Sequence, residues 1–159
     1  MVKIVVGDAT KPIGEGNKII AHVCNDIGAW GKGFVLAVNK LSQRPKNLYK
    51  FAIEKHQIKL GDIQLVLIPE DPSIYVANMV AQHGIVKDEE GEPPIRYDSL
   101  RECLKQVYSE AKQRNATVHM PRIGCGLAGG EWNVVEKIIL EELKDVQVYV
   151  YDLKKEESL

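Results

Sequence analysis

Apolar and polar residues alternate along this chain with two different periods, one typical of strands and one typical of helices. Residues 2–6 and 18–25 read as strands, and the second run (KIIAHVCN) is almost continuously apolar, as in a strand covered on both faces. Four more strands are predicted in the same way, at 62–68, 73–80, 116–120 and 146–153.

Between these strands the apolar spacing becomes helical. Helices are predicted at 32–44, 47–57 and 132–144, and a further one begins near Asp98 or Ser99. Pro45 is expected to separate the first two helices, and Ser99 and Glu102 have the spacing of a capping box. The expected buried stripes are Phe34, Val35, Val38 and Leu41; Leu48, Phe51 and Ala52; Leu100, Cys103, Leu104, Val107, Tyr108 and Ala111; and Val134, Val135, Ile138, Ile139 and Leu143.

The order of these elements predicts an α/β fold. Strands alternate with helices, and the later strands are too far apart in sequence to form hairpins, so a mostly parallel sheet layered between helices is expected. The strands at 62–68 and 73–80 are an exception, because the short turn 69–72 (PEDP) joins them. We expect one domain over residues 1–153, followed by a charged tail at 154–159.

Composition narrows the class of ligand. The chain has 159 residues with 21 basic and 22 acidic side chains, so it presents no general polyanion-binding face and favours a compact ligand. Three widely spaced cysteines predict neither disulfides nor a zinc site, and His56 and His119 have no partners that would suggest a metal. No cofactor is expected. The same cysteine usage predicts a cytoplasmic protein, and charged residues near the amino terminus with no long apolar run predict a soluble one without a membrane partner.

Two glycine-rich segments are candidates for binding an anion. Residues 122–132 (RIGCGLAGGEW) contain G-x-G-x-x-G between a predicted strand and a predicted helix, where backbone amides can point at a phosphate. Residues 25–34 (NDIGAWGKGF) form a second such loop. Each could also be a tight turn without a ligand. In a parallel sheet, segments 7–10, 25–34, 82–84 and 122–130 would meet at one edge, where the two loops could hold a diphosphate.

Four side chains near this edge have candidate roles. Asp8 could accept from an exocyclic amine or cap its own turn, and Asn25 could bond a sugar hydroxyl. His22 is either a buried core histidine or an acid or base near the edge. Cys125 would have a lowered pKa near a helix amino terminus, although a small space-filling role is favoured.

Three segments together resemble the macrodomain family, whose members bind ADP-ribose. They are residues 7–10 (GDAT), 21–34 (AHVCNDIGAWGKGF) and 120–132 (MPRIGCGLAGGEW), and they are most similar to a branch with ADP-ribose-1''-phosphate phosphatases and ADP-ribose glycohydrolases. The resemblance implies a three-layer α/β/α sandwich with a mixed six-stranded sheet. It also implies ligand contacts by Asp8 and Ala9 at the adenine end, by Asn25, Gly28, Ala29, Trp30, Gly31, Lys32, Gly33 and Phe34 at the distal ribose, by Arg122, Ile123, Gly124, Cys125, Gly126, Leu127 and Ala128 at the diphosphate, and by Tyr151.

The same resemblance indicates which of the two reactions, glycoside cleavage or phosphate release, this chain is equipped for. One glycohydrolase of this branch carries an aspartate where this chain has Ala128, and the glycohydrolases carry their catalytic lysine after the middle strand, where this chain reads VAQH over residues 80–83. A covalent route through that lysine therefore has no nucleophile here. The phosphatases carry a histidine and an asparagine that match His22 and Asn25, which favours phosphomonoester hydrolysis with these two as catalytic residues.

Two other functions compete with a hydrolase. The first is a module that recognises ADP-ribose without turnover, because the lysine and the aspartate are missing. The second is a dinucleotide-dependent oxidoreductase, which fits poorly because its glycine fingerprint should follow the first strand. The expected partner is ADP-ribose or an ADP-ribosylated molecule, with nucleic acid only as an ADP-ribosylated substrate.

Overall fold

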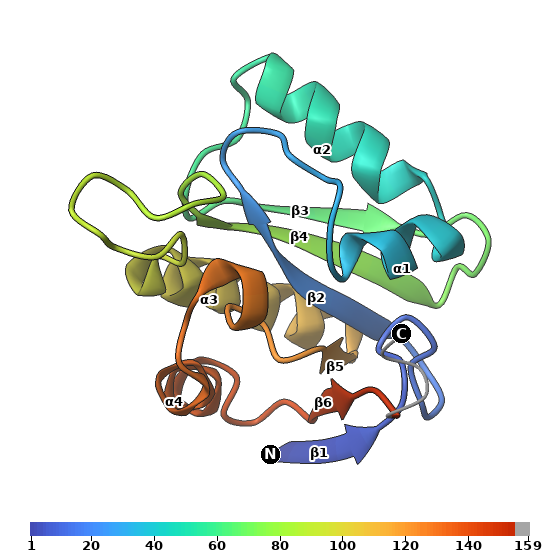
Figure 1. The fold of residues 1–159 in the computed structure, drawn as a ribbon. Coiled ribbons are helices and arrows are strands. Elements are labelled where there is room, and N and C mark those ends of the chain that lie inside the picture. The colour runs from blue at the N-terminus through green and yellow to red at the C-terminus, as the bar shows by residue number, and fades with distance from the viewer. Residues whose placement is uncertain (155–159) are drawn as a thin grey trace.

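A six-stranded mixed sheet forms the centre of the structure, a computed structural model that describes residues 1–154 (Figure 1). Residues 155–159, which belong to the predicted charged tail, lie outside the described residues. The strands follow the order β1-β6-β5-β2-β4-β3, and neighbours are parallel except that β3 is antiparallel to β4. Their bounds are β1 (Val2–Val6), β2 (Lys18–Asn25), β3 (Ile63–Leu67), β4 (Ile74–Gln82), β5 (Thr117–Met120) and β6 (Val148–Asp152).

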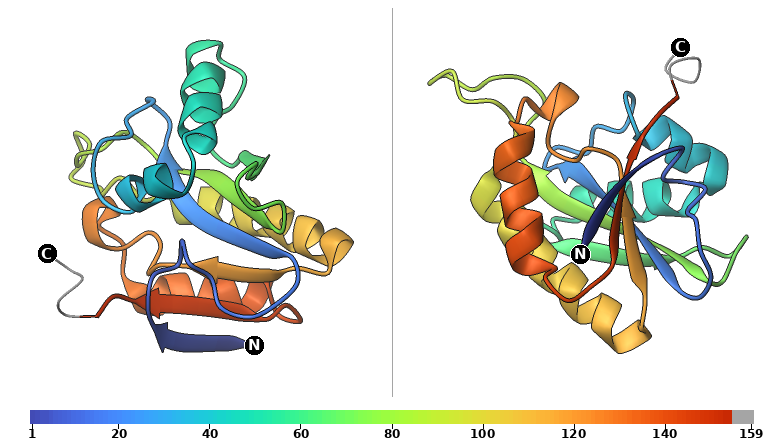
Figure 2. Two further views of the ribbon diagram at one scale, coloured as in Figure 1. Left: turned by 90° about the vertical axis from the view of Figure 1, so that its right-hand side faces the viewer. Right: turned by 90° about the horizontal axis from the view of Figure 1, so that it is seen from below.

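Helices cover both faces of this sheet, so the fold is a three-layer sandwich as predicted (Figures 1 and 2). One layer contains α1 (Val35–Leu41) and α2 (Arg44–Glu54), and the other contains α3 (Tyr97–Arg114) and α4 (Trp132–Glu142). The central strand β2 shows why its sequence is continuously apolar. Ile19 and Ala21 pack in the core under α3 and α4, whereas Ile20 and Cys24 pack in the core under α1 and α2.

The boundary between the first two helices differs from the prediction. Pro45 lies in the first turn of α2 instead of separating two helices, because a first-turn residue needs no intrahelical N–H bond. The buried stripe of α2 was predicted correctly only in part. Ala52 is buried as expected, but Phe51 is 53% exposed, and Tyr49, which the prediction left out, is fully buried.

The predicted capping box of α3 is wrong as well. The helix begins at Tyr97, with Arg96 at the N-cap position and no side-chain cap. The start is set by the segment before the helix, where the Arg96 amide donates to the Ala81 carbonyl at the end of β4. The helix ends where Asn115 adopts a left-handed conformation with φ of 50°.

Five of the six strands run in one direction, and this positions the candidate site. The carboxyl ends of β1, β6, β5, β2 and β4 lie at the same edge of the sheet. The segments that follow them, 7–10, 25–34, 82–84 and 122–130, therefore share that edge, as predicted. Next to the site the register of β2 and β4 is irregular, since Cys24 pairs with Val80 but Asn25 pairs with Gln82.

A candidate ligand cavity between two glycine loops

A cavity of about 890 Å³ lies beyond the carboxyl ends of β2, β4 and β5, which is a typical size for a small-molecule site. Most of the predicted ligand residues line it. They are His22, Asn25, Ala29, Trp30, Gly31, Lys32, Gly33, Phe34, Arg122, Ile123, Gly124, Cys125, Gly126, Leu127 and Ala128. The two glycine loops thus face the same space.

Four residues that the resemblance assigned to the ligand do not line this cavity: Asp8, Ala9, Gly28 and Tyr151. Asp8 Oδ1 accepts from the Thr10 amide at 2.8 Å and from the Thr10 hydroxyl at 2.7 Å, so Asp8 caps its own turn. The Tyr151 hydroxyl accepts from the Ile13 amide at 3.0 Å. Asp8, Ala9 and Tyr151 lie on the β1 and β6 side of the shared edge, whereas Gly28 lies in the first glycine loop, where its amide donates to the Tyr49 hydroxyl.

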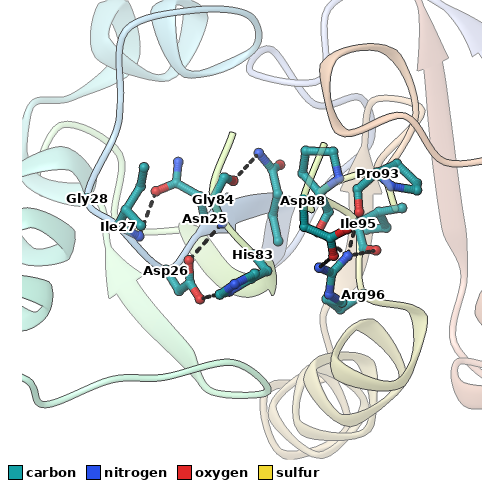
Figure 3. Close-up of polar contacts among 12 residues, drawn as sticks. Asn25, Asp26, Ile27, Gly28, His83, Gly84, Asp88, Pro93, Ile95 and Arg96 are labelled. Atoms are coloured by element: carbon teal, nitrogen blue, oxygen red, sulfur yellow. Dashed lines mark hydrogen bonds and ion pairs between the residues drawn. The ribbon is translucent and has the colours of Figure 1, made fainter. Parts of the chain in front are cut away.

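The carboxamide of Asn25 shapes the first glycine loop. Its Oδ1 accepts from the Ile27 amide at 3.0 Å (Figure 3). The same oxygen accepts from the Ala29 amide at 3.0 Å, and Nδ2 donates to the Ala29 carbonyl at 2.8 Å. One N–H of the carboxamide is left for a ligand. Asn25 therefore positions the loop first, and any contact with a sugar comes through that single donor.

Tyr49 of α2 is part of this arrangement, and the sequence analysis missed it. Its hydroxyl lies 2.5 Å from the Asn25 carbonyl oxygen and 2.8 Å from Asn25 Oδ1, and it accepts from the Gly28 amide at 3.2 Å. Burial raises the pKa of Tyr49 well above its ordinary value, so the hydroxyl stays protonated. No motif marks such a residue, because it is one aromatic side chain on an ordinary amphipathic helix.

The rest of the first loop presents backbone donors. Trp30 is buried, donates from Nε1 to Asn39 Oδ1 at 2.8 Å and packs edge-on against His22. The amides of residues 30–34 donate to no acceptor among the described residues. Because Trp30 anchors the loop, these free N–H groups are held along one wall of the cavity.

The second loop is a compact turn in which a side chain would be strained or would clash at several of the glycine positions. Gly124 and Gly126 have φ of 73° and 55°, a left-handed region that favours glycine. The Gly130 amide donates to the Gly124 carbonyl at 2.7 Å, and a Cβ on Gly130 would lie only 2.3 Å from that oxygen. The amides of residues 124–127 donate to no acceptor among the described residues. Consecutive free amides in a turn of this kind form an anion-binding nest.

Arg122 precedes this loop, and its charge is already neutralised. Its Nε and Nη2 donate to Asp152 Oδ1 and Oδ2, both at 2.8 Å, and its guanidinium lies 4.9 Å from the centre of the Trp132 ring. The pair raises the pKa of Arg122 and lowers that of Asp152. This contact joins the end of β5 to the end of β6 and holds the second loop in place.

His22 lines the cavity wall in a fixed protonation state. Asn78 Nδ2 donates to the Pro45 carbonyl and to Gln64 Oε1, both at 3.1 Å, so Asn78 Oδ1 must accept from His22 Nε2 at 2.6 Å. Burial lowers the pKa of His22 to about 4, which leaves the ring neutral near pH 7. The ring's lone pair is therefore on Nδ1, which the Cys24 thiol approaches at 4.0 Å, so the neutral ring can accept a proton there and has no further N–H to donate.

The prediction of a lowered pKa for Cys125 is wrong. The side chain is half-buried, and burial raises its pKa more than Arg122 lowers it. The loop after it forms a short 3-10 turn over Gly126–Ala128 in place of an α-helix start. Cys125 is therefore a neutral thiol that fills space, the alternative favoured from the sequence.

A segment between β4 and α3, residues 83–96, forms an arm beside the cavity. At its base Asp26 Oδ2 lies 2.7 Å from His83 Nδ1, and Asp26 Oδ1 accepts from the Gly84 amide at 2.8 Å (Figure 3). The next two residues, Ile85 and Val86, are exposed and line the cavity.

The far side of the arm is tied to the second glycine loop. Arg96 pairs with Asp88 at 2.9 Å and donates to the Pro93 carbonyl (Figure 3). The Ile95 amide donates to the Ala128 carbonyl at 3.1 Å. The arm and the loop therefore form one continuous wall.

The charged side chains that line the cavity are Lys32 and Arg122, and no Asp or Glu is among the lining residues of the described chain. A cavity with cations, free amides and no carboxylate favours an anionic ligand. Within residues 1–154 no cluster of three or more His, Cys, Asp or Glu side chains could hold a metal ion. In the same residues no helix is long and apolar enough to cross a membrane.

Comparison with known proteins agrees with this geometry. The profile of the Macro domain family matches residues 21–139, and the chain belongs to this family. A crystal structure of a Bacteroides thetaiotaomicron protein is 51% identical over 96% of this chain and all of that chain, with a TM-score of 0.92. Macrodomain relatives bind ADP-ribose, and some carry names of phosphatases or glycohydrolases.

Two curated relatives differ in how much of them the chain covers. It is 29% identical to the ADP-ribose 1''-phosphate phosphatase of Lodderomyces elongisporus, over 95% of this chain and 99% of that protein. It is 32% identical to the mouse chromodomain-helicase-DNA-binding protein 1-like over 94% of this chain, but it spans only 17% of that protein's length.

Proposed function

We propose that the cavity binds ADP-ribose or a derivative of it, with the diphosphate held by the free amides of residues 124–127. The observation that carries this proposal is the convergence of two runs of unpaired backbone donors, 30–34 and 124–127, on one cavity that has no carboxylate. A diphosphate is a compact acceptor with two negative charges, and it matches such a donor array.

The rest of the ligand would extend to either side of the diphosphate. The distal ribose would lie against the first loop, within reach of the remaining N–H of Asn25 and the rings of Trp30 and Phe34. The adenosine would run along the edge of the sheet toward β6 and β1. Contacts by Asp8 and Tyr151, which lie outside the cavity, fit a ligand of that length.

We further propose hydrolysis of a phosphomonoester such as ADP-ribose-1''-phosphate. The phosphatase of L. elongisporus, which the chain matches over almost its whole length, supports this substrate. Glycoside cleavage usually relies on carboxylates at the scissile bond, and no carboxylate lines this cavity. His22 is the candidate base through Nδ1, and the amides of residues 31–33 are the candidate groups that stabilise charge on the transferred phosphoryl oxygens.

Recognition of ADP-ribose without turnover is the second candidate. It is favoured by two properties of the candidate catalytic residues. The pKa of His22, about 4, makes it a weak base near pH 7, and Asn25 already uses both polar groups to hold its own loop.

A panel of ligands separates these functions. ADP-ribose, ADP-ribose-1''-phosphate, an ADP-ribosylated peptide and ADP-ribosylated DNA are each tested by calorimetry, thermal unfolding and product release. We expect ADP-ribose to bind and to raise the melting temperature, and the 1''-phosphate to release inorganic phosphate. Neither heat nor a thermal shift at millimolar ADP-ribose would contradict the binding proposal.

Turnover is tested by His22→Ala, with circular dichroism to check that the variant folds. Loss of phosphate release with retained ADP-ribose binding supports the assignment of His22. Normal turnover by the variant removes His22 from the reaction. Binding without release by the unmodified protein identifies a recognition module.

A further inference from the structure

The two cationic side chains that line the cavity, Arg122 and Lys32, differ in whether a neighbouring carboxylate balances their charge. Arg122 is held by both oxygens of Asp152 at 2.8 Å and by the face of Trp132, so its charge is balanced before any ligand arrives. Lys32 is exposed and makes no hydrogen bond or ion pair with any residue in the described part of the chain. Lys32 therefore supplies the uncompensated positive charge of the cavity.

Lys32 and the proposed diphosphate site belong to different loops that touch one another. Lys32 lies in the first loop between Gly31 and Gly33, whereas the nest of residues 124–127 belongs to the second loop. The loops meet where Leu127 Cδ1 comes within 3.3 Å of the place a Cβ would take on Gly33. The amides of residues 30–34 are unpaired around the lysine, so the first loop can hold an anion of its own.

The loop that carries Lys32 is held firmly. Asn25 bonds the amides of Ile27 and Ala29, and Trp30 is anchored to Asn39. Only the lysine side chain, with its flexible stem, has to be ordered by a ligand. An ammonium group and free amides on the same loop fit a phosphomonoester, which carries between one and two negative charges at neutral pH.

We propose that Lys32 makes the site selective for ADP-ribose derivatives that carry a second anionic group, such as a phosphomonoester on the distal ribose, over ADP-ribose itself. This selectivity rests on the proposed binding of ADP-ribose. Because a charge-assisted hydrogen bond forms only with the phosphorylated ligand, we expect a preference of about tenfold at low salt. The preference should shrink at high salt, since the lysine is exposed.

Calorimetry with ADP-ribose and ADP-ribose-1''-phosphate tests the proposal, at low and high salt and under conditions where turnover is suppressed by cold. The variants are Lys32→Gln and a matched control, Lys40→Gln, which removes an exposed lysine of α1 that does not line the cavity. We expect Lys32→Gln to weaken ADP-ribose binding severalfold, through the lost positive charge at the cavity, and to weaken binding of the phosphorylated ligand by about tenfold more, so that most of the preference is lost. Lys40→Gln should keep that preference.

Three results would overturn the proposal. An equal loss of affinity for both ligands in Lys32→Gln would mean that the lysine meets the diphosphate. An unchanged preference in that variant would remove Lys32 from recognition, and no preference in the unmodified protein would remove the selectivity itself. Failure of the proposed function is distinguishable, because neither ligand would then bind the unmodified protein.

Discussion

The hydroxyl of Tyr49 in α2 lies within hydrogen-bonding distance of both oxygens of Asn25 at the end of β2, 2.5 Å from the carbonyl and 2.8 Å from Oδ1. It also accepts from the Gly28 amide. A helix on one face of the sheet therefore determines the shape of a loop at its edge. The ligand site depends on a residue that no ligand needs to touch.

Removing this hydroxyl should weaken both the fold and binding. In Tyr49→Phe the buried Asn25 carbonyl and the Gly28 amide lose a partner, which typically costs about 1–3 kcal/mol of unfolding free energy. The loosened loop should lower the affinity for ADP-ribose severalfold. Urea unfolding and calorimetry measure the two effects. The control is Tyr149→Phe, because the hydroxyl of Tyr149 makes no hydrogen bond with described residues. Equal unfolding free energies and equal ADP-ribose affinities in the two variants would contradict the role given to Tyr49.

The second loop should tolerate no side chain at Gly130. A methyl group there would lie 2.3 Å from the Gly124 carbonyl oxygen, so Gly130→Ala must displace the backbone of the turn. We expect a loss of about 3 kcal/mol in unfolding free energy. Gly31→Ala is the matched control in the first loop, because a Cβ there meets no atom within 4 Å. Equal stability of Gly130→Ala and the unmodified protein in urea would show that the turn can rearrange.

Stability should fall as the solution becomes acidic, because two buried histidines are neutral in the folded chain. Burial lowers the pKa of both His22 and His119 to about 4, below the ordinary value of 6.5. Between these values the unfolded chain binds protons that the folded chain does not, so unfolding free energy decreases as pH falls. Above about pH 6.5 the two histidines no longer lower the unfolding free energy, because they are neutral in both the folded and the unfolded chain. The slope is at most about 1.4 kcal/mol per pH unit for each histidine.

Urea unfolding at about pH 7, 6 and 5 measures this slope. His119→Gln should reduce it, because the variant lacks one of the two groups. His56→Asn is the control, since His56 is exposed and has φ of 55°, a conformation that asparagine tolerates. A slope that is flat, or that rises toward acid, would mean that the histidines are charged in the folded protein.

The sequence was sufficient for the parts of this molecule that local patterns determine. The apolar run of β2 predicted a strand buried on both faces, and the glycine spacings predicted two turns at one edge of a parallel sheet. These predictions succeeded because burial on both faces and left-handed turns each require particular residue types in consecutive positions.

Local sequence patterns could not predict contacts between segments that are far apart in the chain. The Asp26 contacts with His83 and Gly84 join residues 57 and 58 positions apart, and the tautomer of His22 depends on Asn78 in the neighbouring strand. A polar residue in the middle of the apolar run of β4 was a signal for Asn78. Tyr49 had no comparable signal, because its role follows from how α2 is placed over the sheet and not from its neighbours in sequence.

Replacing the partner of Arg122 should change ligand affinity more than stability. Asp152→Asn removes a carboxylate from a pair whose side chains are 37% and 42% exposed, so unfolding free energy should change by less than about 1 kcal/mol. The unbalanced guanidinium then adds a positive charge at the cavity, and ADP-ribose should bind severalfold more tightly at low salt, with the gain fading as salt is added. Asp145→Asn is the control, because Asp145 pairs with Lys112 outside the cavity. Weaker binding by Asp152→Asn would instead mean that the pair acts by holding the second loop in position, and that this effect exceeds the added attraction of the charge.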